Sequence, residues 1–227
     1  MQTFRPALVP LLLSLVCARC PAATPKVHTV TLGAMRRVPY TPPEAGAANK
    51  SEESTTLRVR PLFVDDRQKE WTVGEIHDVT DRSFVVRRAL RINDSLPGEV
   101  PRWSWQPGPW LMVDRTTGHI TALHLPAFDP EISQVAWFRD YAAYCGITTA
   151  THSLLVAVVV ELGARKPAVQ KGIENWPMPD APIPVCALPV WQRSPMRATI
   201  QATGGAAMTF EVVGTSSLIE ENEGAEP

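Results

Sequence analysis

The stretch "SFVVRRALRI" (83–92) indicates the fold class of this chain most clearly. Its side chains alternate between two faces, with Phe84, Val86, Leu90 and Ile92 on one and Val85, Arg87, Ala89 and Arg91 on the other. Only Arg88 interrupts the apolar face. A period of two that persists over ten residues is typical of a β-strand and not of a helix.

The segments on the C-terminal side of this strand favour an antiparallel sheet protein. Residues 110–125 read as a hairpin, because Gly118 can supply the positive φ that its turn needs. The run 154–160 is apolar on both faces, which predicts a central strand buried on both sides. Further strands are expected at 135–148, 186–192, 197–203 and 207–213, and no amphipathic helix is visible. We therefore predict an all-β, antiparallel β-meander or sandwich-like single domain.

The remaining segments divide the chain into four parts. Residues 24–54 are expected to hold an N-terminal strand (24–32) and a flexible loop (36–54), followed by the β-rich domain at 55–214. Asn93 to Gln106 reads as a polar connection broken by prolines, and Trp176 to Pro184 as an extended proline-rich strap. The acidic end, residues 215–227, is expected to be disordered.

The first 23 residues have the layout of a secretory signal peptide. Arg5 precedes an apolar run at 7–18, and the small residues Ala22 and Ala23 resemble a cleavage site. The run is shorter than the roughly 20 residues that span a bilayer, so we expect no transmembrane segment. The expected location is the periplasm or the extracellular space.

Cleavage there would leave two of the four cysteines. Cys145 and Cys186 remain, and two cysteines in an oxidising compartment favour one disulfide. The alternative is a reactive thiol at Cys145, although no neighbouring residue supplies a base for a thiolate. Loss of Arg5 and Arg19 would also shift the net charge from −1 to about −3. This charge gives no basic surplus for nucleic-acid binding.

The middle of the chain resembles one repeat of a TolB-like or WD-repeat β-propeller. The similarity rests on "WLMVDRTTGHITALHL" (110–125), "VAWFRDYAAYCGI" (135–147) and "LLVAVVVELGARKPAVQ" (154–170). Phe138, Arg139 and Asp140 stand where those repeats usually carry a proline and a glycine. The resemblance implies a propeller-blade-like antiparallel sheet, and it implies no catalytic residues, since such repeats mark structure and not chemistry.

Two clusters are candidate ligand-binding residues. Trp103, Trp105 and Trp110 fall in "WSWQPGPW", and the first two would share a strand face, as in a sugar-stacking platform. The alternative is that these rings cap the core. A second group could form a ladder that captures an anion if two strands are neighbours, and it comprises Arg58, Arg60, Arg87 and Arg91. The alternative is a solvated charged face.

No catalytic or metal-binding pattern stands out. The sequence lacks a nucleophile elbow, a phosphate-cradling glycine loop and zinc or calcium spacing, so we name no catalytic residue, metal or cofactor. Asp114 and Asp140 would be the most plausible acid–base carboxylates. We expect a non-catalytic structural or protein-interaction module of the bacterial envelope or extracellular space, with a protein partner or self-assembly. The alternatives are a carbohydrate-binding module and a hydrolase.

Overall fold

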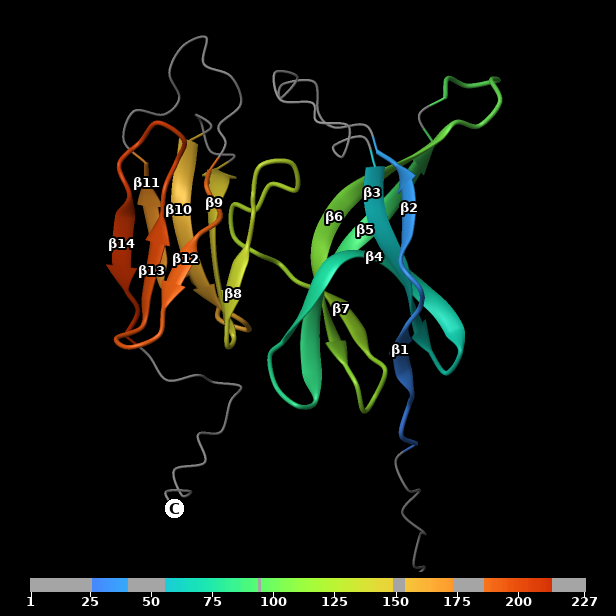
Figure 1. The fold of residues 1–227 in the computed structure, drawn as a ribbon, viewed down its shortest axis with the longest axis horizontal. Coiled ribbons are helices and arrows are strands. Elements are labelled where there is room, and N and C mark those ends of the chain that lie inside the picture. The colour runs from blue at the N-terminus through green and yellow to red at the C-terminus, as the bar shows by residue number, and fades with distance from the viewer. Residues whose placement is uncertain (1–25, 41–55, 94, 149–153, 174–185, 214–227) are drawn as a thin grey trace, which may run out of the picture.

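The protein is all-β, and the antiparallel fold expected from the sequence is confirmed (Figure 1). The computed structural model describes residues 26–40, 56–93, 95–148, 154–173 and 186–213. These residues form three sheets in which every pair of named strands is antiparallel. Within these ranges there is no helix long and apolar enough to cross a membrane.

The first sheet contains seven strands in the order β1-β3-β4-β5-β6-β7, with β2 also paired to β3. Its strands are β1 (Val30–Leu32), β2 (Arg36–Pro39), β3 (Thr56–Val64), β4 (Arg67–Asp78), β5 (Ser83–Asn93), β6 (Trp103–Asp114) and β7 (Ile120–Ala122). The stretch that alternates in the sequence is therefore β5, paired with β4 on one side and β6 on the other.

Each face of this sheet has its own apolar core. One core contains Leu62, and the other contains Val59, which points to the opposite face because it lies three residues away on β3. Register shifts at Val73/His77 and Arg87/Ala89 interrupt the ladders, and such bulges increase the twist of a sheet. The sheet rolls up so far that Tyr40, after β2, pairs with Trp105 of β6.

The second and third sheets pack face to face. The second sheet has the order β11-β10-β9-β8, and the third the order β12-β13-β14. Their strands are β8 (Ala136–Phe138), β9 (Tyr141–Thr148), β10 (Leu154–Glu161), β11 (Val169–Gly172), β12 (Val190–Gln192), β13 (Arg197–Ile200) and β14 (Met208–Glu211). Alternate residues of β9 and β10 pack on Ala198 and Ile200 of β13.

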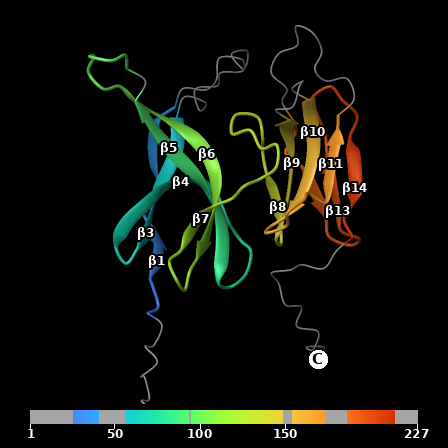
Figure 2. The same cartoon turned by 180° about the vertical axis from the view of Figure 1, so that it is seen from behind.

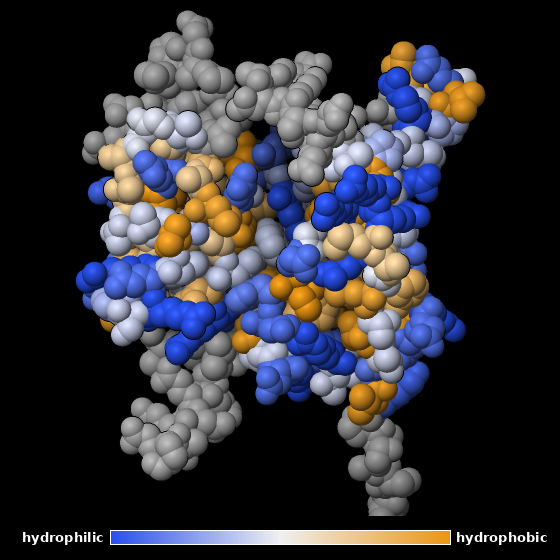
Figure 3. Space-filling model, viewed as in Figure 1, coloured by the Kyte–Doolittle hydropathy of each residue, from blue (hydrophilic) through white to orange (hydrophobic). Residues whose placement is uncertain are grey.

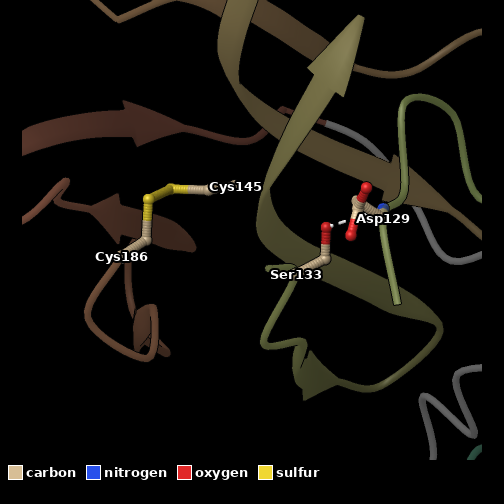
Figure 4. The surroundings of a disulfide bond; sticks show 4 residues. All are labelled: Asp129, Ser133, Cys145 and Cys186. Atoms are coloured by element: carbon tan, nitrogen blue, oxygen red, sulfur yellow. Dashed lines mark hydrogen bonds between the residues drawn. A yellow bond between two sulfur atoms is a disulfide. The ribbon is translucent and has the colours of Figure 1, made fainter. Parts of the chain in front are cut away.

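The disulfide between Cys145 and Cys186 is confirmed, with the two Cα atoms 6.3 Å apart. Figure 4 shows it joining β9 to the segment that leads into β12. The same view shows the Asp129 backbone N–H donating to Ser133 Oγ (3.0 Å) in the connection before β8. Because an oxidised Cys145 has no thiolate, the alternative of a reactive thiol does not apply to this structure.

The connection at 123–135 covers the other face of the second sheet. Tyr144 donates its hydroxyl proton to the Pro126 carbonyl (2.6 Å), and the Ile147 N–H donates to the Ala127 carbonyl (2.7 Å). This approach requires a glycine at 146, where a Cβ would lie 2.3 Å from the Ala127 oxygen. With both faces covered, β10 is buried on both sides, as its apolar run predicts.

The first sheet meets the second through a small shared cluster. Val85 and Met112 of the first sheet pack with Trp137 of β8 and with Leu162, which directly follows β10. His77 Nε2 also donates to the Arg139 carbonyl (2.7 Å). In Figures 1 and 2 the first sheet and the pair formed by the other two stand side by side, joined by the segment that leads from β7 to β8.

The structure corrects the sequence analysis at the start of the predicted flexible loop. Arg36 to Pro39 form β2 because Val38 is buried opposite Leu57, a contact that local periodicity does not reveal. Pro39 is tolerated there because β2 lies at an edge. The predicted strand at 135–148 is also divided into β8 and β9 by a tight turn in which Arg139 adopts a φ of 51°.

Several expectations fall on other parts of the chain. Four of the predicted segments lie outside the described residues: the signal peptide, the loop from residue 41 on, the proline-rich strap and the acidic tail. The stretch that resembles a propeller repeat is shared between sheets. Its first part lies in β6 and β7 of the first sheet, and the rest forms β8 to β11.

Candidate functional site

The hairpin of β5 and β6 extends beyond the first sheet as an arm (Figures 1 and 2). We call residues 92–93 and 95–103 the β5–β6 arm. Four large apolar side chains on it are exposed, namely Ile92 (37%), Leu96 (69%), Val100 (88%) and Trp103 (45%). Figure 3 shows apolar and polar residues side by side at the end of this arm, away from the bulk of the molecule. Solvent-exposed apolar groups gathered in one place are typical of interaction sites.

The end of the arm is an ordered β-turn. Pro97 and Gly98 occupy its central positions, and Gly98 has a φ of 93°, which a type II turn requires. The Glu99 N–H donates to the Leu96 carbonyl (3.1 Å), and the Leu96 N–H donates to Glu99 Oε2 (3.4 Å). Leu96 and Val100 therefore flank a turn with a defined backbone.

Asn93 closes the base of the arm. Its Oδ1 accepts hydrogen bonds from the Ser95 N–H (3.2 Å), the Ser95 hydroxyl (2.8 Å) and the Arg102 N–H (3.0 Å). One side chain thus ties both strands of the loop together. This is the local side-chain bonding for which asparagine is favoured in turns.

The three tryptophans of the predicted sugar-stacking platform are not brought together. Trp103 is half exposed on the arm, with the Arg91 guanidinium carbon 4.5 Å from its ring centroid. Trp105 is only 5% exposed and packs edge-to-face on Trp71 (5.4 Å between centroids). Trp110 packs on Trp137 (5.1 Å) between the sheets. The platform prediction is therefore wrong, because the rolled sheet encloses Trp105 in a core.

The predicted arginine ladder does not form either. Its prediction needed β3 and β5 to be neighbours, but β4 lies between them. Arg58 instead faces Arg37 of β2 in the register, and Arg60 donates to the Gly74 carbonyl (3.3 Å). Arg91 lies against Trp103 on the arm.

Arg87 of the predicted ladder has a structural role. Its guanidinium donates to the backbone carbonyls of Gly108 and Pro130, which ties β6 to the connection at 123–135. Burial lowers the pKa of Arg87 to about 10, so the side chain stays charged at neutral pH. Burial also raises the pKa of the nearby Tyr40. Arg87 and Tyr40 are therefore structural residues of this junction.

Both acid–base candidates lie at turns. Asp114 Oδ1 accepts the N–H groups of Thr116 (2.8 Å) and Thr117 (2.9 Å), which makes it a turn-stabilising residue. Desolvation raises the pKa of Asp114, but these bonds and Arg82 outweigh it and lower the pKa. Asp140 is fully buried in the turn between β8 and β9. Among the described residues, no three His, Cys, Asp or Glu side chains are placed to hold a metal ion.

Sequence reasoning missed the apolar end of the arm. Leu96 and Val100 lie in the connection that the sequence marks as polar. Prolines and acidic residues surround them there, so no apolar pattern is visible. The signal was present in the turn "LPGE" (96–99), since Pro followed by Gly specifies a type II turn. A short turn between two long strands implies a projecting hairpin.

Comparisons with known proteins return nothing for this chain: no family model, curated protein or solved structure matches it.

Proposed function

We propose that this protein is a secreted, non-catalytic interaction module that binds a protein partner through the β5–β6 arm. The observation that carries the proposal is the exposure of Leu96 and Val100 on both sides of an ordered turn. Removing such side chains from water is favourable by about 25 cal/mol per Å² of apolar surface. A partner with an apolar pocket would gain that free energy on binding.

The order of the arm adds to this argument. The bonds to Asn93 Oδ1 and the turn at Pro97 and Gly98 fix the backbone before any partner arrives. A binding segment that is already ordered loses less conformational entropy on association. Trp103 and Arg91 lie at the base of the arm, and tryptophan and arginine are enriched among residues that dominate binding energy.

A protein partner fits the arm better than a glycan does. Of the three tryptophans expected to stack on sugars, Trp103 alone is exposed, and the side chains at the tip are aliphatic. Aliphatic groups offer a sugar neither a ring to stack on nor a hydrogen bond. The glycan-binding and hydrolase alternatives thus have no matching group of residues on the arm.

The proposed compartment is the periplasm or the extracellular space. The Cys145–Cys186 bond is consistent with an oxidising compartment, where disulfides persist. The signal-peptide pattern of residues 1–23 supports export. Cell fractionation of the tagged full-length chain would test this directly.

Site-directed photo-cross-linking in the native host tests the arm. A photoreactive amino acid replaces Val100, and a matched control replaces Gln170, which is exposed on β11. We expect one discrete adduct with another protein from position 100 and none from position 170. Loss of that adduct on adding Leu96→Asp would tie it to the tip.

Two results would overturn the proposal. Equal cross-linking from positions 100 and 170 would mean that the arm is not selective. Absence of any adduct, together with quenching of tryptophan emission by oligosaccharides, would favour the carbohydrate-binding alternative. An adduct with a second copy of this chain would make self-assembly the function of the arm.

A further inference from the structure

A polar cleft lies at the end of the first sheet opposite the arm. It has a volume of about 440 Å³, and its lining includes Lys26, His28, Asp65, Arg67, Lys69 and Thr117. These residues come from the segment before β1, the β3–β4 turn, the start of β4 and the β6–β7 turn. Because β6 begins in the arm and ends at Asp114, the two places are separated by the length of that strand.

Asp65 organises one wall of the cleft. Its Oδ2 accepts from Lys26 Nζ (3.3 Å) and pairs with His28 Nδ1 (2.8 Å), while its Oδ1 accepts the Thr29 N–H (3.1 Å). The negative charge of this carboxylate is thus already matched by donors within the protein. With Nδ1 engaged, Nε2 is the remaining ring nitrogen of His28 for a ligand.

The cleft carries a surplus of positive charge. Lys26, Arg67 and Lys69 line it against a single carboxylate, which leaves two positive charges even with His28 neutral. The whole chain, by contrast, has a net charge of −1. A local surplus of this sign inside a concave surface attracts anions.

The turns that form the cleft have defined backbones. Asp65 and Asp66 have φ values of 50° and 58°, as a tight hairpin turn of type I′ requires. Gly118, with a φ of 65°, sits so close to Val64 that a Cβ there would lie 2.4 Å from a Val64 methyl carbon. The contributing segments, which are far apart in the sequence, are therefore held together in the fold.

We infer that this cleft binds a tetrahedral dianion, namely the phosphate or sulfate group of a ligand. Arg67 supplies a planar fork that matches such oxygens, and Lys69 supplies a point charge, while Lys26 is paired with Asp65. The Thr117 hydroxyl adds a neutral donor at the rim. The cleft lies within the range of volumes typical of small-ligand sites.

Isothermal titration calorimetry of the chain without the predicted signal peptide, with inorganic phosphate and with sulfate, tests this site. Chloride replaces the anion at constant ionic strength in the reference titration. We expect saturable binding of one dianion, with affinity on the order of tenfold lower for Arg67→Gln or Lys69→Gln. Lys171→Gln, on exposed β11, is the matched control and should bind as the unmodified chain does.

Equal loss in Lys171→Gln and Lys69→Gln would overturn the inference, since it would reduce the effect to general charge. Heats no larger than those with chloride would also overturn it. If binding is confirmed, a phosphate monoester and a sulfated sugar compared at equal concentration would identify which source the cleft prefers. The arm variant Leu96→Asp should keep full dianion binding, so the two proposals can fail separately.

Discussion

The guanidinium carbon of Arg91 on β5 lies 4.5 Å from the ring centroid of Trp103 on β6. The two residues are diagonal neighbours in the ladder, because Arg91 is paired with Trp105 and Trp103 with Asn93. A cation over a tryptophan face contributes about 0.5–1 kcal/mol at an exposed site. This pair therefore stiffens the base of the arm.

Replacing Arg91 with Ala should lower the free energy of unfolding by about 0.5–1 kcal/mol. Urea unfolding of the variant measures this, with Arg91→Lys as the control that retains a cation. Because the arm also becomes less ordered, the cross-link from position 100 should weaken more in Arg91→Ala than in Arg91→Lys. Equal behaviour of the two variants would contradict the role given to the charge.

Reduction of the Cys145–Cys186 disulfide should destabilise the pair of packed sheets. The bond closes a loop with a sequence separation of 41, for which the chain-entropy model gives roughly 4 kcal/mol. Urea unfolding of the double variant Cys145→Ala/Cys186→Ala, compared with the unmodified chain with and without reductant, measures the loss. An unchanged urea midpoint would show that closing this loop does not stabilise the fold.

The two faces of β10 should be equally sensitive to truncation. Val158 and Val159 are both fully buried, the first under the 123–135 connection and the second against the third sheet. Val158→Ala and Val159→Ala should each cost about 2 kcal/mol of unfolding free energy, because each leaves a cavity. Leu154→Ala, at a 44% exposed position of the same strand, should change it by less than about 0.5 kcal/mol.

Asp65 should make stability depend on pH in the acid range. The backbone bond from Thr29, followed by the bond from His28, lowers the pKa of Asp65 from 3.8 to about 2. A carboxyl whose pKa is lower in the folded state stabilises the fold fully above 3.8 and loses that contribution as the pH falls through about 2.

Thermal unfolding between these pH values should therefore show a decline in the unmodified chain and a shallower one in Asp65→Asn. At neutral pH the variant should be the less stable protein. Parallel pH curves for the two proteins would show that the lowered pKa of Asp65 does not act on folding.

The sequence predicted the strands that have a strong local pattern. The alternation at 83–92 and the apolar run at 154–160 both form central strands. Neither stretch has the periodicity of an amphipathic helix, so the strand is the structure that each pattern predicts. The cysteine pair was also predictable, since only two cysteines follow the predicted signal peptide. These features depend on a few residues at short range.

The candidate sites depended on pairing order and curvature, which no local pattern reports. The ladder failed because β4 separates Arg60 from Arg87, and the tryptophan platform failed because the sheet rolls around Trp105. The cleft around Asp65 joins segments that are distant in the sequence, since Lys26 and Asp65 are 39 residues apart. The tip of the arm was missed as well, although its "LPGE" turn is a local signal in the sequence.

The hydrogen bonds of the turn and of Asn93, and the contact of Arg91 with Trp103, all join residues between Arg91 and Trp103. The recognition element that we propose could consequently be transferred to another molecule. A short cyclic peptide of this stretch, or its graft onto a hairpin of an unrelated scaffold, would carry the same turn without the rest of the chain. Under the function that we propose, such a mimic would compete with the parent protein for its partner and inhibit binding without altering the folded protein.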